Sequence, residues 1–195
     1  MKTVFLDIDS QRDFLYPAGA LYVPGAERIV AAIARLNRFA AAQGMPVIST
    51  SDAHTEDDPE FQVWPHHCVA GTWGQQKAGS TLLARRIVIP NRESSRAEVR
   101  GAQQIVIEKQ TVDAFRSANL GPILEALAAD RYVVYGVVTE ICVYYAVRGL
   151  LETGRPVVVV SDAIESLKPA DGQKAIAEMC GRGAMVAPAA EVCSG

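Results

Sequence analysis

The chain has 195 residues, of which 49% are hydrophobic and 21% are charged, an ordinary composition for one globular domain. Its net charge of −3 gives no electrostatic reason to expect a nucleic acid or an anionic membrane as partner. No apolar run is long enough to predict a transmembrane helix. We therefore expect a single domain over residues 1–195.

The N-terminal stretch MKTVFLDID combines a lysine with apolar residues, but Asp7 and Asp9 interrupt it too early for a signal peptide. The four cysteines include no C-x-x-C pair, so neither a zinc knuckle nor a thioredoxin-like motif is predicted. We expect free thiols and a cytoplasmic protein.

Apolar runs and helical periodicity alternate along the chain. Short apolar runs predict strands, and spacing of three or four residues between apolar positions predicts helices. The predicted strands cover 3–8, 46–50, 104–108, 132–137, 156–163 and 184–188. The predicted helices cover 27–44, 120–130, 139–154 and 169–182.

This alternation indicates an α/β fold. About six strands separated by helices favour a mostly parallel sheet covered on both faces. Because such connections are right-handed, we predict a three-layer α/β/α sandwich. Residues 74–103 are polar and rich in arginine, and we interpret them as an excursion that contacts a second subunit of a homo-oligomer.

Polar and reactive side chains follow the predicted strands. Asp9 follows the first strand, Lys109 ends the third, and Cys142 lies in the first turn of the helix after the fourth. Parallel sheets bind ligands beyond the carboxyl ends of their strands, so these groups suit amide hydrolysis by a thiol. Taken singly, each has a plainer interpretation: a turn-capping aspartate, a surface lysine and a buried apolar cysteine.

All three histidines lie in one segment, DAHTEDDPEFQVWPHHCVAGT, residues 52–72. Asp52 and His54 are two residues apart, so in an extended chain their side chains point the same way. His67 is far enough along the chain to fold back toward them. Spacing alone leaves two alternatives open, a solvated polar loop and a site for Zn²⁺, Fe²⁺ or Mn²⁺.

Several motifs together resemble the isochorismatase-like cysteine hydrolases, and among them the nicotinamidases. They are DSQRDFLYPAGALYVPGA (9–26), DAH (52–54), WPHHCVAGT (64–72), EKQTVDAF (108–115) and GVVTEICV (136–143). The resemblance spans nearly the whole chain, in the family's order. It implies the same α/β/α fold and a cis peptide bond between Val137 and Val138.

The resemblance also implies roles for individual residues. The catalytic triad would be Asp9, Lys109 and Cys142, and the oxyanion would be held by the backbone N–H groups of Val138 and Cys142. Phe14 and Trp64 would hold an aromatic ring, or be plain core aromatics. A divalent ion, with Zn²⁺ first and Fe or Mn as alternatives, would be bound by Asp52, His54, Glu60 and His67.

The resemblance implies a small carboxamide as substrate, with nicotinamide converted to nicotinate and ammonia. Parts of the pattern also suit three other functions. One is a hydrolase of another amide, carbamate or isochorismate-like compound. A nucleotide-binding module is disfavoured because neither G-x-G-x-x-G nor the P-loop motif occurs. A metal-storing or structural protein would leave Cys142 and Lys109 without a role.

Overall fold

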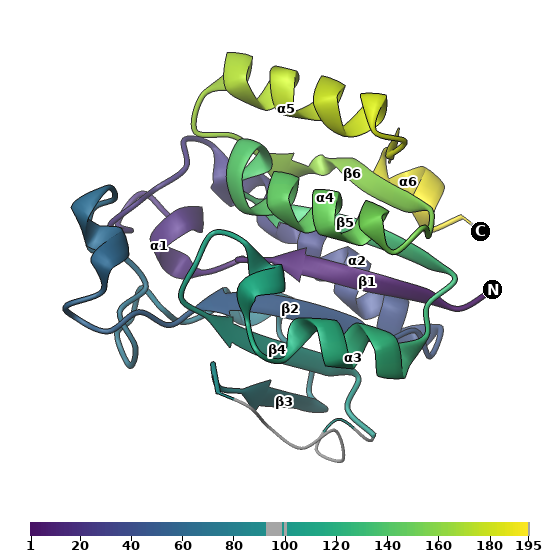
Figure 1. The fold of residues 1–195 in the computed structure, drawn as a ribbon, viewed down its shortest axis with the longest axis horizontal. Coiled ribbons are helices and arrows are strands. Elements are labelled where there is room, and N and C mark those ends of the chain that lie inside the picture. Colours follow the sequence, from purple (N-terminus) through teal and green to yellow (C-terminus); the bar gives the residue numbers. More distant parts are fainter. Residues whose placement is uncertain (93–98, 100, 195) are drawn as a thin grey trace.

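The computed structural model describes residues 1–92, 99 and 101–194, and these form one sheet of seven parallel strands. The strand order is β3-β4-β2-β1-β5-β6-β7, so β1 lies at the centre (Figure 1). The strands are β1 (Thr3–Ile8), β2 (Val47–Asp52), β3 (Arg86–Ile89), β4 (Gln104–Lys109), β5 (Arg131–Val137), β6 (Val157–Glu165) and β7 (Met185–Ala187).

Helices cover both faces of this sheet. In Figure 1, α2 lies behind the sheet, and α3 and α4 lie in front of it. The α-helices are α1 (Arg12–Leu15), α2 (Val30–Ala42), α3 (Leu120–Leu127), α4 (Tyr144–Glu152), α5 (Pro169–Gly181) and α6 (Ala189–Val192). Short 3₁₀ turns cover Ala26–Ile29, Pro59–Gln62, Gly79–Thr81 and Ala114–Arg116. The predicted three-layer sandwich is confirmed.

The strand count is a correction, because the sheet has seven strands rather than about six. The additional strand is β3, which pairs with β4 at one edge of the sheet. Its sequence, RIVI, is only four residues long. Of its residues only Ile89 is buried, and three apolar residues in a row are too few to mark a strand buried on both faces.

The segment 74–103 also contacts its own chain extensively. Besides forming β3, it places Lys77 in an antiparallel bridge with Gln11, and the Ala78 N–H donates to the Ser10 carbonyl at 2.9 Å. Within the described residues it therefore packs on the sheet and beside the turn after β1. Residues 93–98 and 100, in the middle of the predicted excursion, lie outside the described residues.

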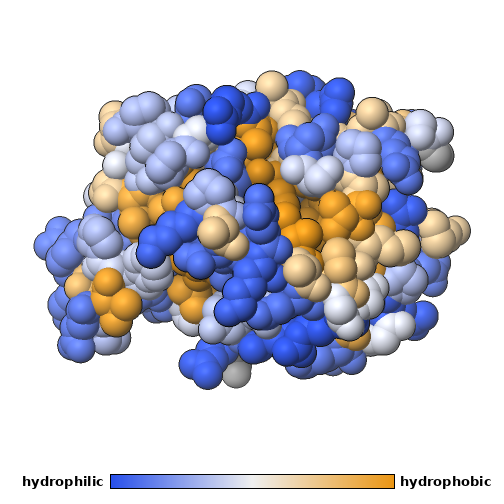
Figure 2. All heavy atoms as spheres, turned by 90° about the horizontal axis from the view of Figure 1, so that it is seen from above, coloured by the Kyte–Doolittle hydropathy of each residue, from blue (hydrophilic) through white to orange (hydrophobic). Residues whose placement is uncertain are grey.

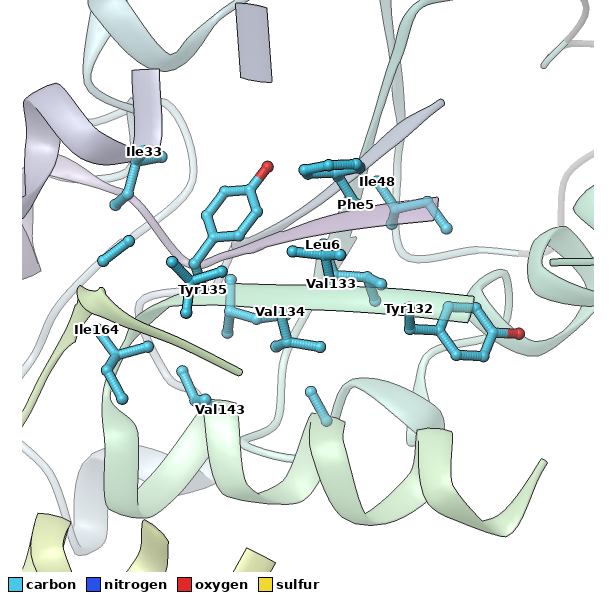
Figure 3. Close-up of a cluster of buried hydrophobic side chains, with 14 of the residues drawn as sticks. Phe5, Leu6, Ile33, Ile48, Tyr132, Val133, Val134, Tyr135, Val143 and Ile164 are labelled. Atoms are coloured by element: carbon cyan, nitrogen blue, oxygen red, sulfur yellow. The ribbon is translucent and has the colours of Figure 1, made fainter. Parts of the chain in front are cut away.

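The core fills both spaces between the sheet and its helices. Figure 3 shows Phe5 and Tyr135 on one side of the central strands, and Val134 and Val143 on the side of α4. The rings of Phe5 and Tyr135 meet edge to face, with centroids 6.3 Å apart. All four side chains are buried, so the central strands are held from both faces, and the residues at their carboxyl ends have a rigid support.

One glycine permits the close approach of β5 to β1. Gly136 has φ of 119°, and a Cβ at this position would lie 2.0 Å from the Ile8 carbonyl oxygen. Any other residue would push the two strands apart. Because Asp9 follows Ile8 directly and Cys142 follows β5, this approach controls how closely those two side chains can meet.

Hydrophilic residues dominate the face shown in Figure 2, and hydrophobic residues form a band between them. Among the described residues, no helix has the length and apolar character needed to cross a membrane.

Candidate active site

The predicted catalytic and metal-binding residues lie at or beyond the carboxyl ends of four neighbouring strands. Asp52 and Lys109 are the last residues of β2 and β4, and Asp9 directly follows β1. Cys142 lies in the π-helical turn Thr139–Val143 that follows β5. Because these strands are adjacent in the order β4-β2-β1-β5, residues as far apart as 9 and 142 become neighbours.

Asp9, Lys109 and Cys142 form one buried cluster. The Lys109 Nζ lies 2.9 Å from Asp9 Oδ2 and 4.0 Å from Cys142 Sγ. The exposed fractions are 1%, 1% and 7% for Asp9, Lys109 and Cys142, so the three groups interact with little screening by water.

The protonation states in this cluster follow from burial and charge. Burial alone would raise the pKa of Asp9, but the Lys109 ammonium and a hydrogen bond from Thr50 outweigh it and lower the pKa. Burial raises the pKa of the Cys142 thiol well above its usual value, although Lys109 acts in the opposite direction. The resting pair is therefore an aspartate beside a neutral thiol, and the thiolate forms only when Asp9 takes the proton.

Lys109 remains charged despite its burial. Burial by itself would lower the pKa of its ammonium, but the adjacent carboxylates of Asp52 and Asp9 raise it well above its usual value. The Lys109 Nζ donates to Asp52 Oδ1 at 2.5 Å. Burial raises the pKa of Asp52 to about 7, with Lys109 pulling it downward. One ammonium therefore pairs with two carboxylates and links the triad to the segment of residues 52–72 that holds the three histidines, the histidine loop.

The structure brings together three of the four predicted metal ligands. Asp52, His54 and His67 are buried, and one potential ligand atom from each lies within 4.8 Å of the others. Glu60 is outside this group of three, but its Oε1 lies 3.9 Å from His67 Nε2. Burial raises the pKa of this glutamate. Glu60 lies in the 3₁₀ turn Pro59–Gln62.

Both histidines present the correct nitrogen for a metal. The His54 Nδ1 lies 2.9 Å from Asp58 Oδ2, and the His67 Nδ1 lies 2.7 Å from the Pro65 carbonyl oxygen. Each Nδ1 therefore carries the proton and donates it, which leaves the lone pair on Nε2. His54 Nε2 is buried without a hydrogen-bond partner among the described residues. A cation would supply that partner, so the donor set fits a divalent ion.

His66 faces away from this group. It is exposed, and its ring stacks on Phe61 with centroids 4.2 Å apart. His67 is buried instead, with its ring centroid 4.9 Å from that of His54. Of the two adjacent histidines, only His67 therefore lies beside His54.

A narrow cavity with an empty volume of about 300 Å³ connects the thiol to the histidine loop. Its polar lining comes from Cys142 and the candidate metal ligands Asp52, Glu60 and His67. Its apolar lining comes from Phe14, Leu21, Trp64, Val112, Val138, Ile141 and Leu167. A mostly apolar lining with a few polar groups is typical of small-molecule sites.

The peptide bond between Val137 and Val138 is cis, as the resemblance implies. Val138 and Cys142 both line the cavity. The Val138 carbonyl accepts from the N–H groups of Ile141 and Val143, each at 3.1 Å. The Val138 N–H donates none of the described backbone hydrogen bonds outside helices and strands.

Sequence reasoning missed the residues that orient this site. Asp58 orients His54 and also caps the turn at Pro59–Gln62 through the Glu60 N–H. Gln11 donates to the Asp52 carbonyl at 2.8 Å and accepts from its N–H at 2.7 Å. Thr50 donates to Asp9 Oδ1 at 2.6 Å. Only Asp58, followed by proline, carried a local sign of a turn cap.

The Isochorismatase domain family matches residues 3–191 of this sequence, and the chain belongs to that family. It is 26% identical to the nicotinamidase of Escherichia coli (strain K12) in an alignment 204 residues long, gaps included. This alignment covers 91% of this chain and 90% of that one. It is 27% identical to the N-carbamoylsarcosine amidase of an Arthrobacter species over 163 residues, covering 80% of this chain and 57% of the relative.

A solved structure supports the same fold. The pyrazinamidase of Pyrococcus horikoshii, described in complex with zinc, superposes with a TM-score of 0.80 and 26% sequence identity. The match covers 96% of this chain and 99% of that one. The similarity therefore extends over nearly the whole chain.

Proposed function

We propose that the protein is a metal-dependent amidase that converts nicotinamide to nicotinate and ammonia. The observation that carries this proposal is a cavity that has Cys142 together with Asp52, Glu60 and His67 in its wall. The nicotinamidase and pyrazinamidase relatives support the same substrate class. A carboxamide on a pyridine ring has two polar ends, and the cavity offers chemistry for both.

The first half of the proposed reaction forms a thioester. Asp9 accepts the Cys142 proton as Sγ attacks the carboxamide carbon, and the electron pair of the C=O bond moves to oxygen. The N–H groups of Val138 and Cys142 hold this oxyanion. Asp9 then gives the proton to the departing nitrogen, the C–N bond breaks, and ammonia leaves. Lys109 remains charged throughout and holds the Asp9 carboxylate.

The second half releases the acid. Asp9 takes a proton from water as the water oxygen attacks the thioester carbon. The S–C bond then breaks, Asp9 gives its proton to the Cys142 sulfur, and nicotinic acid leaves and ionises in water to nicotinate. The aromatic residues Phe14 and Trp64 line the cavity, where they would pack against the two faces of the pyridine ring.

Asp52, His54, Glu60 and His67 would hold the divalent ion, with Zn²⁺ as our first choice and Fe²⁺ or Mn²⁺ as alternatives. When bound, the ion supplies a Lewis-acid site to which the ring nitrogen can coordinate. The chain's own contribution is to keep both imidazoles in the Nδ1–H form, through Asp58 and Pro65.

Replacing His67 with alanine should remove the ion, whereas His66→Ala should retain it. The reason is that only the His67 ring is buried beside His54. Metal content after dialysis, measured by mass spectrometry of the purified variants, checks this expectation without any activity assay. Equal metal content in the two variants would contradict the proposed ligand set.

The substrate proposal is tested by comparing nicotinamide with benzamide. Benzamide has nearly the same shape but lacks the ring nitrogen, so it should release ammonia much more slowly if the ion orients the ring. Treatment with a chelator should remove activity on nicotinamide, and added Zn²⁺ should restore it. Equal rates on both amides, or full activity of metal-free protein, would contradict the proposal.

A second candidate is a hydrolase of another amide or a carbamoyl compound. The N-carbamoylsarcosine amidase relative favours it. So does an open groove outside the cavity, which shares Trp64, Ile141 and Leu167 with it. A substrate larger than nicotinamide could extend into this groove. Ammonia release from a panel of small amides and carbamoyl compounds distinguishes the two candidates.

We place the enzyme in the cytoplasm, in the salvage of pyridine nucleotides, where its free thiols would stay reduced. Self-association stays a prediction of the sequence that light scattering can test.

A further inference from the structure

A second buried ion pair lies behind the triad. Asp7 precedes Asp9 by two residues, and its Oδ2 lies 3.5 Å from the Nζ of Lys77. The side chains of Asp7 and Lys77 are 0% and 3% exposed. Lysine and aspartate are seldom buried so completely unless they are paired, so each of these charges depends on the other.

Asp7 is also held by neutral donors. Its Oδ2 accepts from Asn37 Nδ2 at 3.1 Å and from Ser49 Oγ at 3.0 Å. The Asn37 Oδ1 in turn accepts from the Tyr135 hydroxyl at 2.5 Å. These contacts anchor the carboxylate between β1, β2 and α2, and thereby fix the place of the lysine beside it.

Lys77 reaches the triad through Thr50. Its Nζ donates to the Thr50 carbonyl at 3.0 Å. The Thr50 hydroxyl accepts from the Asp9 N–H at 3.1 Å, so its own proton points to Asp9 Oδ1, 2.6 Å away. With Oδ1 occupied in this way, Oδ2 is the oxygen left to face Lys109, whose Nζ lies 4.0 Å from the Cys142 sulfur.

The backbone of Lys77 is fixed at the same place. It forms an antiparallel bridge with Gln11, and the neighbouring Gln76 carbonyl accepts from the Arg12 N–H at 2.9 Å. The segment that carries Lys77 is therefore bonded to the turn that directly follows Asp9. The backbone of Lys77 is thus bonded to the turn after Asp9, and its ammonium is bonded to Thr50, which contacts the same aspartate.

We propose that Lys77, neutralised by Asp7, is a positioning residue for Asp9 and acts through Thr50. By holding the Thr50 carbonyl, it fixes the hydroxyl that selects which oxygen of Asp9 accepts the thiol proton. The inference rests on the proposed thiol mechanism, but not on the identity of the amide.

The test measures how fast iodoacetamide alkylates Cys142, read from the Cys142 peptide by mass spectrometry. This rate reports formation of the thiolate and requires no natural substrate. Asp9→Asn gives the reference value for complete loss of the base. Because Lys77→Met alone would leave Asp7 buried and unpaired, the variant tested is Asp7→Asn/Lys77→Met, which removes both charges and keeps an acceptor for Asn37 and Ser49.

We expect this double variant to fold and to have a higher melting temperature than Lys77→Met. Iodoacetamide should alkylate its Cys142 roughly tenfold to a hundredfold more slowly than Cys142 of the wild type, the range that a small misplacement of a catalytic group produces. On nicotinamide, kcat should fall by a similar factor while KM changes little. Alkylation of the double variant at the wild-type rate, or of Asp9→Asn at that rate, would overturn the proposal.

A double-mutant cycle tests the route through Thr50. Thr50→Val should slow alkylation by itself, and adding Asp7→Asn/Lys77→Met to it should slow the reaction little further. Fully additive losses would show that Lys77 does not act through Thr50.

Val158→Ala is the control. It removes buried apolar volume from β6, which β5 separates from β1, and Val158 belongs neither to the Asp7 network nor to the cavity lining, so the variant should have a lower melting temperature and an unchanged alkylation rate. Loss of the alkylation rate in this variant would mean that general loosening explains the effect. If the wild type releases no ammonia from nicotinamide, the substrate proposal fails, while the alkylation rates still decide the role of Lys77.

Discussion

Cys142→Ala should eliminate ammonia release and leave the fold and the bound metal intact. Removal of a catalytic nucleophile costs on the order of a millionfold in rate, since no neighbouring group can form the covalent intermediate in its place. The Cys142 side chain is small and lines the cavity, so its truncation should not disturb the sheet. Circular dichroism and metal content check the intact fold, and an ammonia assay checks the activity.

Two of the other three cysteines provide the control for this prediction. Cys180 is exposed and Cys193 is half-buried, and neither lines the cavity. Cys180→Ala and Cys193→Ala should therefore retain normal activity. Substantial turnover by Cys142→Ala, or loss of turnover in either control, would show that the nucleophile has been assigned to the wrong residue.

Asp9→Asn should lower kcat by about a hundredfold to ten-thousandfold, the usual cost of losing one positioned acid–base group. The neutral thiol of Cys142 has its pKa raised by burial, so it cannot ionise readily without a base. The amide of asparagine keeps the shape of the side chain and can still accept from Thr50. Steady-state kinetics on nicotinamide measure the effect.

A matched control is Asp57→Asn, which removes an exposed carboxylate from the histidine loop. This variant should have nearly wild-type kcat, because an exposed charge is screened by water. A fall of less than tenfold for Asp9→Asn would indicate that Asp9 only supports the structure of the turn after β1.

Much of the fold could be predicted because buried parallel strands have a plain signature. Runs such as TVFLDI and YVVYGV consist mostly of apolar residues, and both lie in the middle of the sheet. The edge strand β3 escaped prediction because half of its surface faces solvent. Its four residues follow directly on Arg85 and include Arg86, so periodicity alone could not separate it from a polar loop.

The candidate site was predictable where chemistry follows strand order. Asp9, Asp52, Lys109 and Cys142 come at or just after strand ends, so topology alone brings them together. Thr50, Gln11 and Lys77 could not be recognised, because their roles depend on which neighbour each side chain meets across two or three strands. The neutral resting thiol was also not predictable. A helix start and a nearby lysine favour a thiolate, but burial outweighs both.

The order of the central strands has a consequence for how the protein assembles. The contacts that build the site join residues far apart along the chain, with separations of 41 residues for Asp9 and Thr50, and 57 for Asp52 and Lys109. Contacts of such long range must close large loops before they contribute any stability, which makes parallel sheets slow to fold. The ribosome must also release β5 before Cys142 can meet Asp9. The reactive thiol can therefore be assembled only after the centre of the sheet is complete, and a growing chain carries its histidine loop well before it has a nucleophile.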